Sequence, residues 1–375
     1  MRIAVLSRHF SRSSGGAESY AVALVQGMVP CHDVHVFSQE SDQPVAGVTY
    51  HTVLRLFDRP RWLNQLVFSF STWFQTRHDY DLVHSHENTW HGQVQTIHVR
   101  PMRRNLFFGV TGVRLFFRWL KVLTSPRLIT YLFLEGARFK CAPSRTIVAT
   151  SDLLRQECEE AYPHCTGIIK EIPPGVKLPG LMPERVVARQ ALGLPLGGRV
   201  ILFVANDYAR KGLATLLKAL ALLPSDVSLV VVGNPNAAAK YRPQALQLGI
   251  QCRVHFLGSL GNLSPAYAAA DCLAHPTLED SFAMVVLEAM AHGLPVIVSG
   301  PEQCGISRQL THNVNAFLLL DPQDEYELAT QVGAVLSDQS SALNLRHGGL
   351  AFAKQHTWES AILKYEQIYS QAASH

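Results

Sequence analysis

The stretch "DSFAMVVLEAMAHGLPVIVS", residues 280–299, joins a helix pattern to a strand pattern and decides the fold class. Residues 282–291 are apolar on almost every side, which is typical of a helix buried all round. The run at 295–299 that follows Gly293 is typical of a strand in a parallel sheet. A buried helix leading into such a strand predicts an α/β fold.

Glu288 is the one charged residue inside this apolar helix. A buried carboxylate is costly unless hydrogen-bond donors satisfy it. The two hydroxyls of a ribose have the spacing to satisfy one carboxylate, so we expect Glu288 to bind a ribose. A purely structural buried carboxylate is the alternative.

The residues before this helix are candidates for phosphate binding. Asp280 and Ser281 have capping as their simplest role. The amides of Phe282, Ala283 and Met284 are the free donors of a helix start, where anions bind readily. We therefore expect Ser281, Phe282 and Ala283 to hold one face of a diphosphate.

Similar strand and helix patterns alternate along the whole chain, which predicts parallel sheets with helical crossovers. At 375 residues the chain is long enough for two domains. The alternation of strand and helix patterns is interrupted by the Pro- and Gly-rich stretch 172–183. We expect domains at 1–178 and 179–356, with a helix at about 357–372 that packs back on the first domain. The expected strands are 2–7, 33–38, 81–85, 94–99, 146–150, 199–205, 227–233, 252–257, 272–275 and 295–299. The expected helices include 17–28, 61–77, 152–162, 211–223, 240–248, 282–292 and 324–337.

Two short segments follow expected strands, where ligands bind in doubly wound folds. In "FVANDYARKGL" (203–213), Arg210 and Lys211 stand at an expected helix start, where cations are unfavourable unless an anion is bound nearby. In "GGAESY" (15–20), Gly15 and Gly16 allow either a tight turn or a close approach by a ligand. Solvated side chains and a plain turn are the alternatives.

The segment 280–299 resembles the signature of the family 4 retaining glycosyltransferases, which have the GT-B fold of two facing Rossmann-like domains. In that family a Glu-x7-Glu pair precedes Ala-Met-Ala-x-Gly-x-Pro-Val-Ile. Here Asp280 stands at the first acidic position and Glu288 at the second, which binds the ribose of the donor. The resemblance implies a catalytic role for Asp280.

Other segments resemble further elements of the same family. Lys211 matches the lysine of its phosphate loop, and Asn206 replaces the usual arginine, so we expect Arg210 to supply that charge. Gly15 and Gly16 match the glycine loop that approaches the donor. "TIH" (96–98) resembles the Thr-x-His element, which implies that His98 contacts the transferred sugar.

The resemblance implies a hexosyltransferase of the bacterial cell envelope. It implies a nucleotide-diphosphate sugar such as a UDP-sugar as donor, and a lipid-linked or lipopolysaccharide-core acceptor. No cofactor and no metal are expected, because side-chain cations stabilise the leaving diphosphate. A sugar-nucleotide epimerase and an inactive nucleotide-sugar-binding protein remain the alternatives.

The segment 100–140 is strongly basic and aromatic, with Glu135 as its one acid. Such a composition favours an anionic membrane surface or a phosphorylated lipid acceptor. Packing into the first domain and binding of single-stranded nucleic acid are the alternatives, and no nucleic-acid module accompanies the segment. The residues expected to contact membrane or acceptor are Arg103, Arg104, Phe107, Phe108, Arg114, Arg118 and Trp119.

Composition narrows the remaining choices. The net charge of +4 is mild, and seven scattered cysteines without a C-x-x-C pair fit reduced thiols. No signal peptide or spanning segment is apparent. A metal pair at His84 and His86 lacks further ligands at a suitable spacing. We expect a cytoplasmic protein that associates peripherally with the inner face of the membrane.

Overall fold

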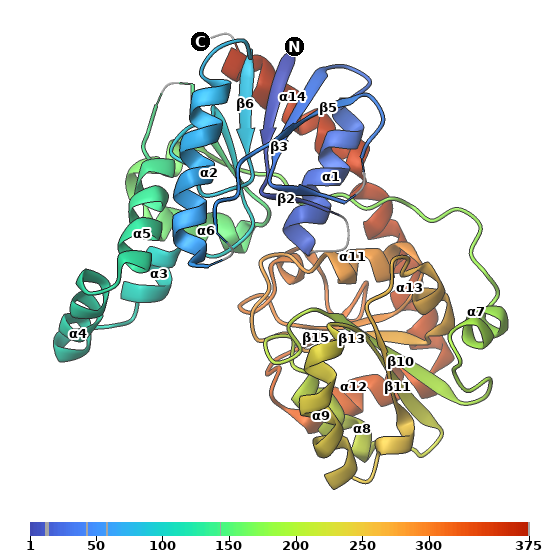
Figure 1. Cartoon of the computed structure of the whole chain (residues 1–375). Coiled ribbons are helices and arrows are strands. Elements are labelled where there is room, and N and C mark those ends of the chain that lie inside the picture. The colour runs from blue at the N-terminus through green and yellow to red at the C-terminus, as the bar shows by residue number, and fades with distance from the viewer. Residues whose placement is uncertain (12–14, 43, 58, 143, 374–375) are drawn as a thin grey trace. The chain divides into compact units, whose positions relative to one another are not determined.

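A computed structural model describes residues 1–11, 15–42, 44–57, 59–142 and 144–373 (Figure 1). The chain divides into two compact units. The first contains Met1–Pro174 and the segment that begins at Trp358, and the second contains Gly175–Thr357. The division after residue 174 lies four residues before the expected boundary at 178, inside the Pro-rich stretch.

The first unit is built on a parallel sheet that has seven strands in the described ranges, in the order β5-β3-β1-β6-β7-β8-β9. Its central strands are short apolar runs, as burial on both faces requires. The strands are β1 (Arg2–Leu6), β3 (Asp33–Ser38), β5 (Val48–Thr52), β6 (Leu82–Ser85), β7 (Val94–Ile97), β8 (Thr146–Ala149) and β9 (Ile169–Glu171). A separate short pair joins β2 (His9–Phe10) to β4 (Glu40–Ser41).

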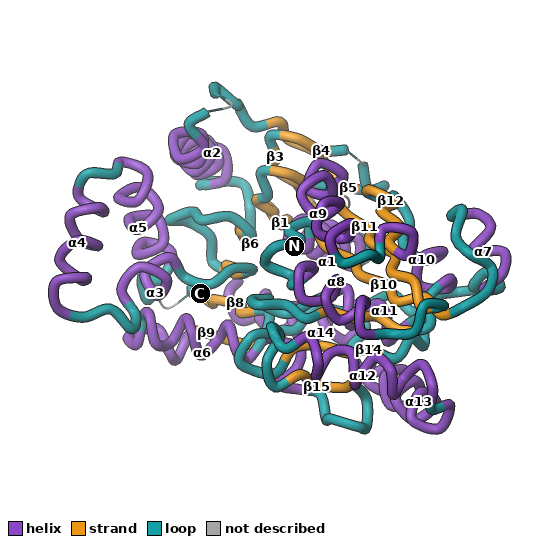
Figure 2. Tube along the Cα trace, turned by 90° about the horizontal axis from the view of Figure 1, so that it is seen from below, coloured by secondary structure: helices purple, strands orange, loops and turns teal. Residues whose placement is uncertain are grey.

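Helices connect the strands of this sheet as crossovers. They are α1 (Gly16–Met28), α2 (Arg61–Thr76), α3 (Met102–Phe107), α4 (Gly112–Leu123), α5 (Pro126–Arg138), α6 (Asp152–Ala161) and the 3-10 helix η1 (Pro163–Ile168). The segment 100–140, for which the sequence patterns predicted no elements, thus forms α3, α4 and α5. Figures 1 and 2 both place α4 at the outer end of the first unit, beyond α3 and α5. None of the helices in the described ranges is long and apolar enough to cross a bilayer.

The last helix, α14 (Trp358–Ala373), packs against α1, β6 and β7. The Tyr365 hydroxyl lies 2.8 Å from Thr96 Oγ1 and 2.9 Å from the Tyr20 hydroxyl. The Tyr369 hydroxyl lies 2.8 Å from His84 Nδ1. These buried hydrogen bonds join the end of the chain to the first sheet.

The second unit repeats the architecture with a parallel sheet of six strands in its described residues, in the order β12-β11-β10-β13-β14-β15. The strands are β10 (Arg199–Ala205), β11 (Val227–Gly233), β12 (Val254–Gly258), β13 (Cys272–His275), β14 (Val296–Ser299) and β15 (Phe317–Leu319). The helices are α7 (Arg185–Ala191), α8 (Leu213–Leu222), α9 (Pro235–Gln247), α10 (Ser264–Ala269), α11 (Met284–Ala291), α12 (Glu325–Ser337), α13 (Gln339–Gln355) and the short η2 (Gln251–Arg253) and η3 (Gly305–Gln309).

Alternate residues of β10 enter two different apolar cores. Leu202 belongs to the core that contains α11, whereas Ile201 and Phe203 belong to the core that contains α8 and α12. The period of two along a strand thus buries side chains on both faces of the sheet, as expected for the central strand β10. The strand order reverses between β10 and β13, and in the first unit between β1 and β6. In doubly wound sheets, ligands bind outside the carboxyl ends of the strands at such a reversal.

Candidate donor-binding site

Two loops meet at the reversal point of the second unit, one after β10 and one after β13. The Leu278 amide donates to the Arg210 carbonyl at 2.9 Å, and the Thr277 hydroxyl donates to the same carbonyl at 3.3 Å. Gly212 has φ +79°, and a Cβ there would collide with the Pro276 carbonyl oxygen. Glycine at this position therefore lets the two loops pack together.

Arg210 and Lys211 lie in this turn and not at a helix start. The prediction of a helix over 211–223 was wrong at its first residues, because α8 begins at Leu213 after the left-handed Gly212. Their position is therefore weaker evidence for a bound anion than a place at the helix start would be, because the helix dipole acts mainly within the first turn. What places them is the contact between the loops.

Lys211 is fixed by the neighbouring loop. Its Nζ donates to Asp280 Oδ2 at 2.6 Å and to the Glu279 carbonyl at 2.9 Å. An ammonium group has three donors, and the described residues use two of them, so one is left for a ligand. The side chain is 19% exposed, which leaves the charge within reach of an anion. Arg210 is half-exposed, and its guanidinium lies 3.5 Å from the Glu279 carboxylate.

Asp280 organises the loop after β13. Its Oδ2 accepts from Lys211 and, at 3.1 Å, from His275 Nε2, while its Oδ1 accepts from the amides of Phe282 at 3.3 Å and Ala283 at 2.9 Å. Burial by itself would raise the pKa of Asp280, but the His275 hydrogen bond and the Lys211 charge outweigh it and hold that pKa well below its usual value. These four donors occupy the carboxylate, so Asp280 positions Lys211 and the turn.

The turn before α11 differs from the expected helix start. The helix begins at Met284, and Ala283 has a left-handed φ of 73°. The amides of Phe282 and Ala283 donate to Asp280, so the prediction that they are free for a diphosphate was wrong. Ser281 lies half-buried in the same turn, and Asn206 is exposed directly after β10.

Glu288 lies on α11 with its carboxylate held from one side. The Tyr267 hydroxyl, on α10, donates to Glu288 Oε2 at 2.8 Å. In the described part of the chain, Oε1 accepts no hydrogen bond. Burial raises the pKa of Glu288, and the Tyr267 hydrogen bond opposes that shift. A carboxylate with one oxygen fixed and one available is suited to a hydroxyl-bearing ligand.

In the first unit, the glycine pair stands where α1 begins. Gly15 caps the helix with an extended φ of 168°, which any residue adopts, and α1 starts at Gly16. A Cβ on Gly15 would come 2.7 Å from Glu18 Oε2, the end of a flexible side chain, and a Cβ on Gly16 would meet open space. Packing against the described residues of this unit therefore does not demand either glycine. The preceding residues 12–14 lie outside the described ranges.

His98 follows the end of β7 and forms a stacked pair with His86. Its Nε2 lies 3.0 Å from His86 Nδ1. The Tyr20 ring makes an edge-to-face contact with the His98 ring, with 5.0 Å between the ring centres. Burial, helped by the Arg138 charge, lowers the pKa of His98 to about 3, so the imidazole is neutral at pH 7. A neutral imidazole can orient or polarise a hydroxyl.

His84 does not join a metal pair with His86. Its Nδ1 forms a hydrogen bond with the Tyr369 hydroxyl at 2.8 Å, and its Nε2 forms one with the Thr96 hydroxyl at 2.7 Å. Both nitrogens are therefore satisfied inside the core.

The sequence patterns did not predict Tyr267 as the partner of Glu288 or His275 as a partner of Asp280. His275 ends β13 at the carboxyl edge of its sheet, where ligands bind in doubly wound folds, and this position is a signal that could have found it.

The two ends of segment 100–140 behave differently. Arg104 pairs with Glu160 at 2.9 Å and Glu157 at 3.3 Å, and the Arg103 guanidinium lies 5.1 Å from the centre of the Tyr162 ring. The expectation that these two arginines contact a membrane or acceptor is thus not supported by their internal contacts. On α4, the expected Arg114 and Arg118 form no ion pair in the described ranges, and Trp119 stacks on Phe107. Phe108 is exposed at the end of α3.

Comparison with known proteins defines the class. Residues 14–178 match the family model "Glycosyltransferase Family 4", and residues 185–350 match "Glycosyl transferases group 1". The chain aligns along its length with the crystal structure of WaaG, a glycosyltransferase involved in lipopolysaccharide biosynthesis, at a TM-score of 0.85 and 20% identity, covering 98% of this chain and 99% of that one. Anabaena Alr3699/HepE in complex with UDP-glucose aligns at a TM-score of 0.75 and 21% identity, covering all of both chains. The fold is therefore GT-B.

Sequence relatives agree with this class. The D-inositol 3-phosphate glycosyltransferase of Xylanimonas cellulosilytica is 32% identical over 246 residues, 60% of this chain and 58% of that protein. The lipopolysaccharide glucosyltransferase WaaG of Escherichia coli is 27% identical over 206 residues, 53% of this chain and 54% of that protein. The matched regions span a little over half the length of these curated relatives. With both family models matched, the chain belongs to the family 4 glycosyltransferases.

Proposed function

We propose that the protein is a retaining glycosyltransferase that moves a hexose from a nucleotide-diphosphate sugar, such as a UDP-sugar, to a cell-envelope acceptor. The observation that carries the proposal is Lys211, held by Asp280 at the reversal point of the second sheet with one donor left over. A cation held in place where these two loops meet can stabilise the negative charge that develops on a leaving diphosphate. WaaG among the relatives favours a lipopolysaccharide-core acceptor.

The other site residues take roles that follow from their contacts. Arg210 is half-exposed and adds a second cation that can move toward the diphosphate. Glu288 accepts from a ribose hydroxyl through Oε1, while Tyr267 holds Oε2. His98, neutral at pH 7, orients a hydroxyl of the transferred sugar. Because side chains supply the cations, the reaction needs no metal ion.

Helix α4 supports an acceptor at a membrane surface. Val113, Phe116, Phe117, Leu120 and Leu123 repeat at helical spacing, and each is between 47% and 71% exposed. This apolar stripe faces away from the protein core, the reverse of an ordinary surface helix.

Basic residues flank the stripe. Arg114, Arg118 and Lys121 line a groove of about 500 Å³ together with Phe117. An amphipathic helix with cations beside exposed aromatics binds the interface of an anionic bilayer. We therefore propose that α4 docks the protein peripherally on the inner face of the cytoplasmic membrane.

The donor is tested by measuring melting temperatures with a panel of nucleoside diphosphates and their sugars. A ligand at 100 times its Kd adds about 2.7 kcal/mol to the free energy of unfolding. The nucleotide that raises the melting temperature most identifies the base of the donor. NMR of the product then gives the anomeric configuration of the transferred sugar, which tests whether that configuration is retained. Binding without transfer to any acceptor would leave the sugar-nucleotide-binding alternative. Inversion of the free sugar nucleotide would point to an epimerase.

A further inference from the structure

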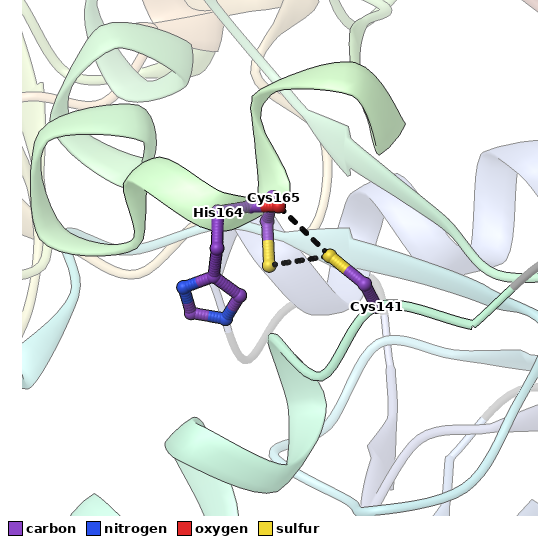
Figure 3. A group of neighbouring side chains, drawn as sticks. All are labelled: Cys141, His164 and Cys165. Carbon is purple, nitrogen blue, oxygen red and sulfur yellow. Dashed lines mark hydrogen bonds between the residues drawn. The ribbon is translucent and has the colours of Figure 1, made fainter.

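Three potential metal ligands gather in the first unit, on residues that take no part in the proposed donor site. Cys141 follows α5, and His164 and Cys165 belong to η1. The two Sγ atoms are 3.4 Å apart, and one ligand atom from each of the three residues lies within 4.8 Å of the others. Figure 3 shows the thiols directed toward one another, with the imidazole beside Cys165. We propose that Cys141, His164 and Cys165 bind one thiophilic divalent cation such as Zn²⁺.

The spacing suits a tetrahedral ion. Zn–S bonds of about 2.3 Å at tetrahedral angles place two sulfurs about 3.8 Å apart. The observed 3.4 Å differs from this by a few tenths of an ångström, which small side-chain rotations supply. Cys141 and His164 are exposed, so an ion has a path from solvent and a water molecule can take the fourth position.

Binding exchanges protons for the metal. Both thiols now donate to backbone carbonyls, Cys141 to His164 at 3.0 Å and Cys165 to Phe139. When Zn²⁺ binds, two Zn–S bonds and one Zn–N bond form, and two thiol protons leave to solvent. The two thiolates neutralise the charge of the ion. His164 Nε2 lies 3.2 Å from the Phe139 carbonyl, so binding through Nε2 shifts the ring proton to Nδ1.

The proton release makes the affinity pH-dependent. Because the metal competes with these protons, affinity should rise with pH across the neutral range. The bound ion would link Cys141, which follows α5, to η1. It would thereby restrain the C-terminal end of α5.

The test uses the full-length protein, reduced and stripped of metal, titrated with Co²⁺ as a spectroscopic substitute for Zn²⁺. We expect one ion per chain, a thiolate-to-cobalt charge-transfer band, and displacement of that band by Zn²⁺. Cys141→Ser and His164→Ala should each weaken binding by at least about tenfold, the loss that even an outer-shell partner causes. Both residues are exposed, so these variants keep the test independent of the buried Cys165.

Cys252→Ser is the matched control, since Cys252 is exposed in the second unit. It should bind cobalt as the unaltered chain does. A reduced protein that gives no charge-transfer band overturns the proposal, as does a Cys141→Ser variant with unchanged affinity. The formation of a Cys141–Cys165 disulfide in air by a protein that takes up no metal when reduced would identify a redox pair instead.

Discussion

Lys211 depends on Asp280 for its position, and this pair sets the most direct test of the donor site. Lys211→Ala removes the fixed cation but leaves Asp280 with His275 and two amides, so the loop keeps its shape. A hydrogen bond to a charged group contributes about 1.5–3 kcal/mol, which corresponds to about a 10- to 150-fold loss of affinity for UDP. Isothermal titration calorimetry measures it. Lys218→Ala, an exposed lysine on α8, is the control and should change nothing.

Tyr267 offers a second test at the residue scale. Tyr267→Phe removes the donor to Glu288 Oε2 and frees the carboxylate to rotate. We expect affinity for UDP to fall by about 2- to 10-fold, less than for a lost ligand contact, because Tyr267 acts on the ligand only through the position of Glu288. The ratio of UDP to 2′-deoxy-UDP affinity should fall as well, because the ribose contact is the one disturbed. Tyr241→Phe, a buried tyrosine on α9, serves as the control, and an unchanged ratio in Tyr267→Phe would contradict the role given to Glu288.

Helix α4 carries the prediction at the scale of elements. Phe116→Ser combined with Phe117→Ser interrupts the exposed apolar stripe without removing core contacts, since both rings are more than 60% exposed. Co-sedimentation with vesicles of phosphatidylglycerol should then be lost. Leu222→Ser, an exposed leucine on α8, should leave it intact.

The basic side chains of α4 should contribute to vesicle binding independently of its apolar stripe. Arg114→Gln and Arg118→Gln should each weaken vesicle binding about fivefold at low salt, since a cation near an anionic surface contributes about 1 kcal/mol. Added salt should erase the difference. Equal binding to neutral phosphatidylcholine vesicles would show that charge has no part in docking.

Elements differ in how well local patterns predict them. The central strands of both sheets were predicted nearly residue for residue, because burial on both faces requires a continuous apolar run. The strands β5, β9 and β15 were missed. Each lies at the edge of its sheet and is short or polar, so its pairing comes from the neighbouring strand and not from its own sequence.

At the scale of the whole molecule, the buried network around His84 predicts acid sensitivity. Burial, with smaller effects of His98 and Arg138, lowers the pKa of His84 to about 3, against about 6.5 in an unfolded chain. The unfolded chain therefore binds the proton more tightly. Stability is fully present above pH ~6.5 and is lost as the pH falls toward 3, by about 2 kcal/mol at pH 5 from His84 alone.

Melting temperatures at pH 7 and pH 5 measure this loss. His84→Gln should show a smaller difference between the two pH values than the unaltered chain, although it is less stable at pH 7. His347→Gln, an exposed histidine on α13, should behave as the unaltered chain does. Identical pH dependence in His84→Gln and the unaltered chain would rule out His84 as the source.

The fold class and the family were determined by the sequence itself. Apolar runs of strand length, a buried helix with one carboxylate and the motif at 280–299 are local patterns, and each follows from side chains near one another in the chain. Tertiary structure alone decided the partners. Lys211 meets Asp280 across 69 residues, and Tyr20 meets Tyr365 across 345, because the sheets bring distant loops and helices together. Roles that depend on a neighbour, such as the positioning function of Asp280, the hold of Tyr267 on Glu288 and the Cys141–Cys165 contact, therefore emerge only when the chain is folded.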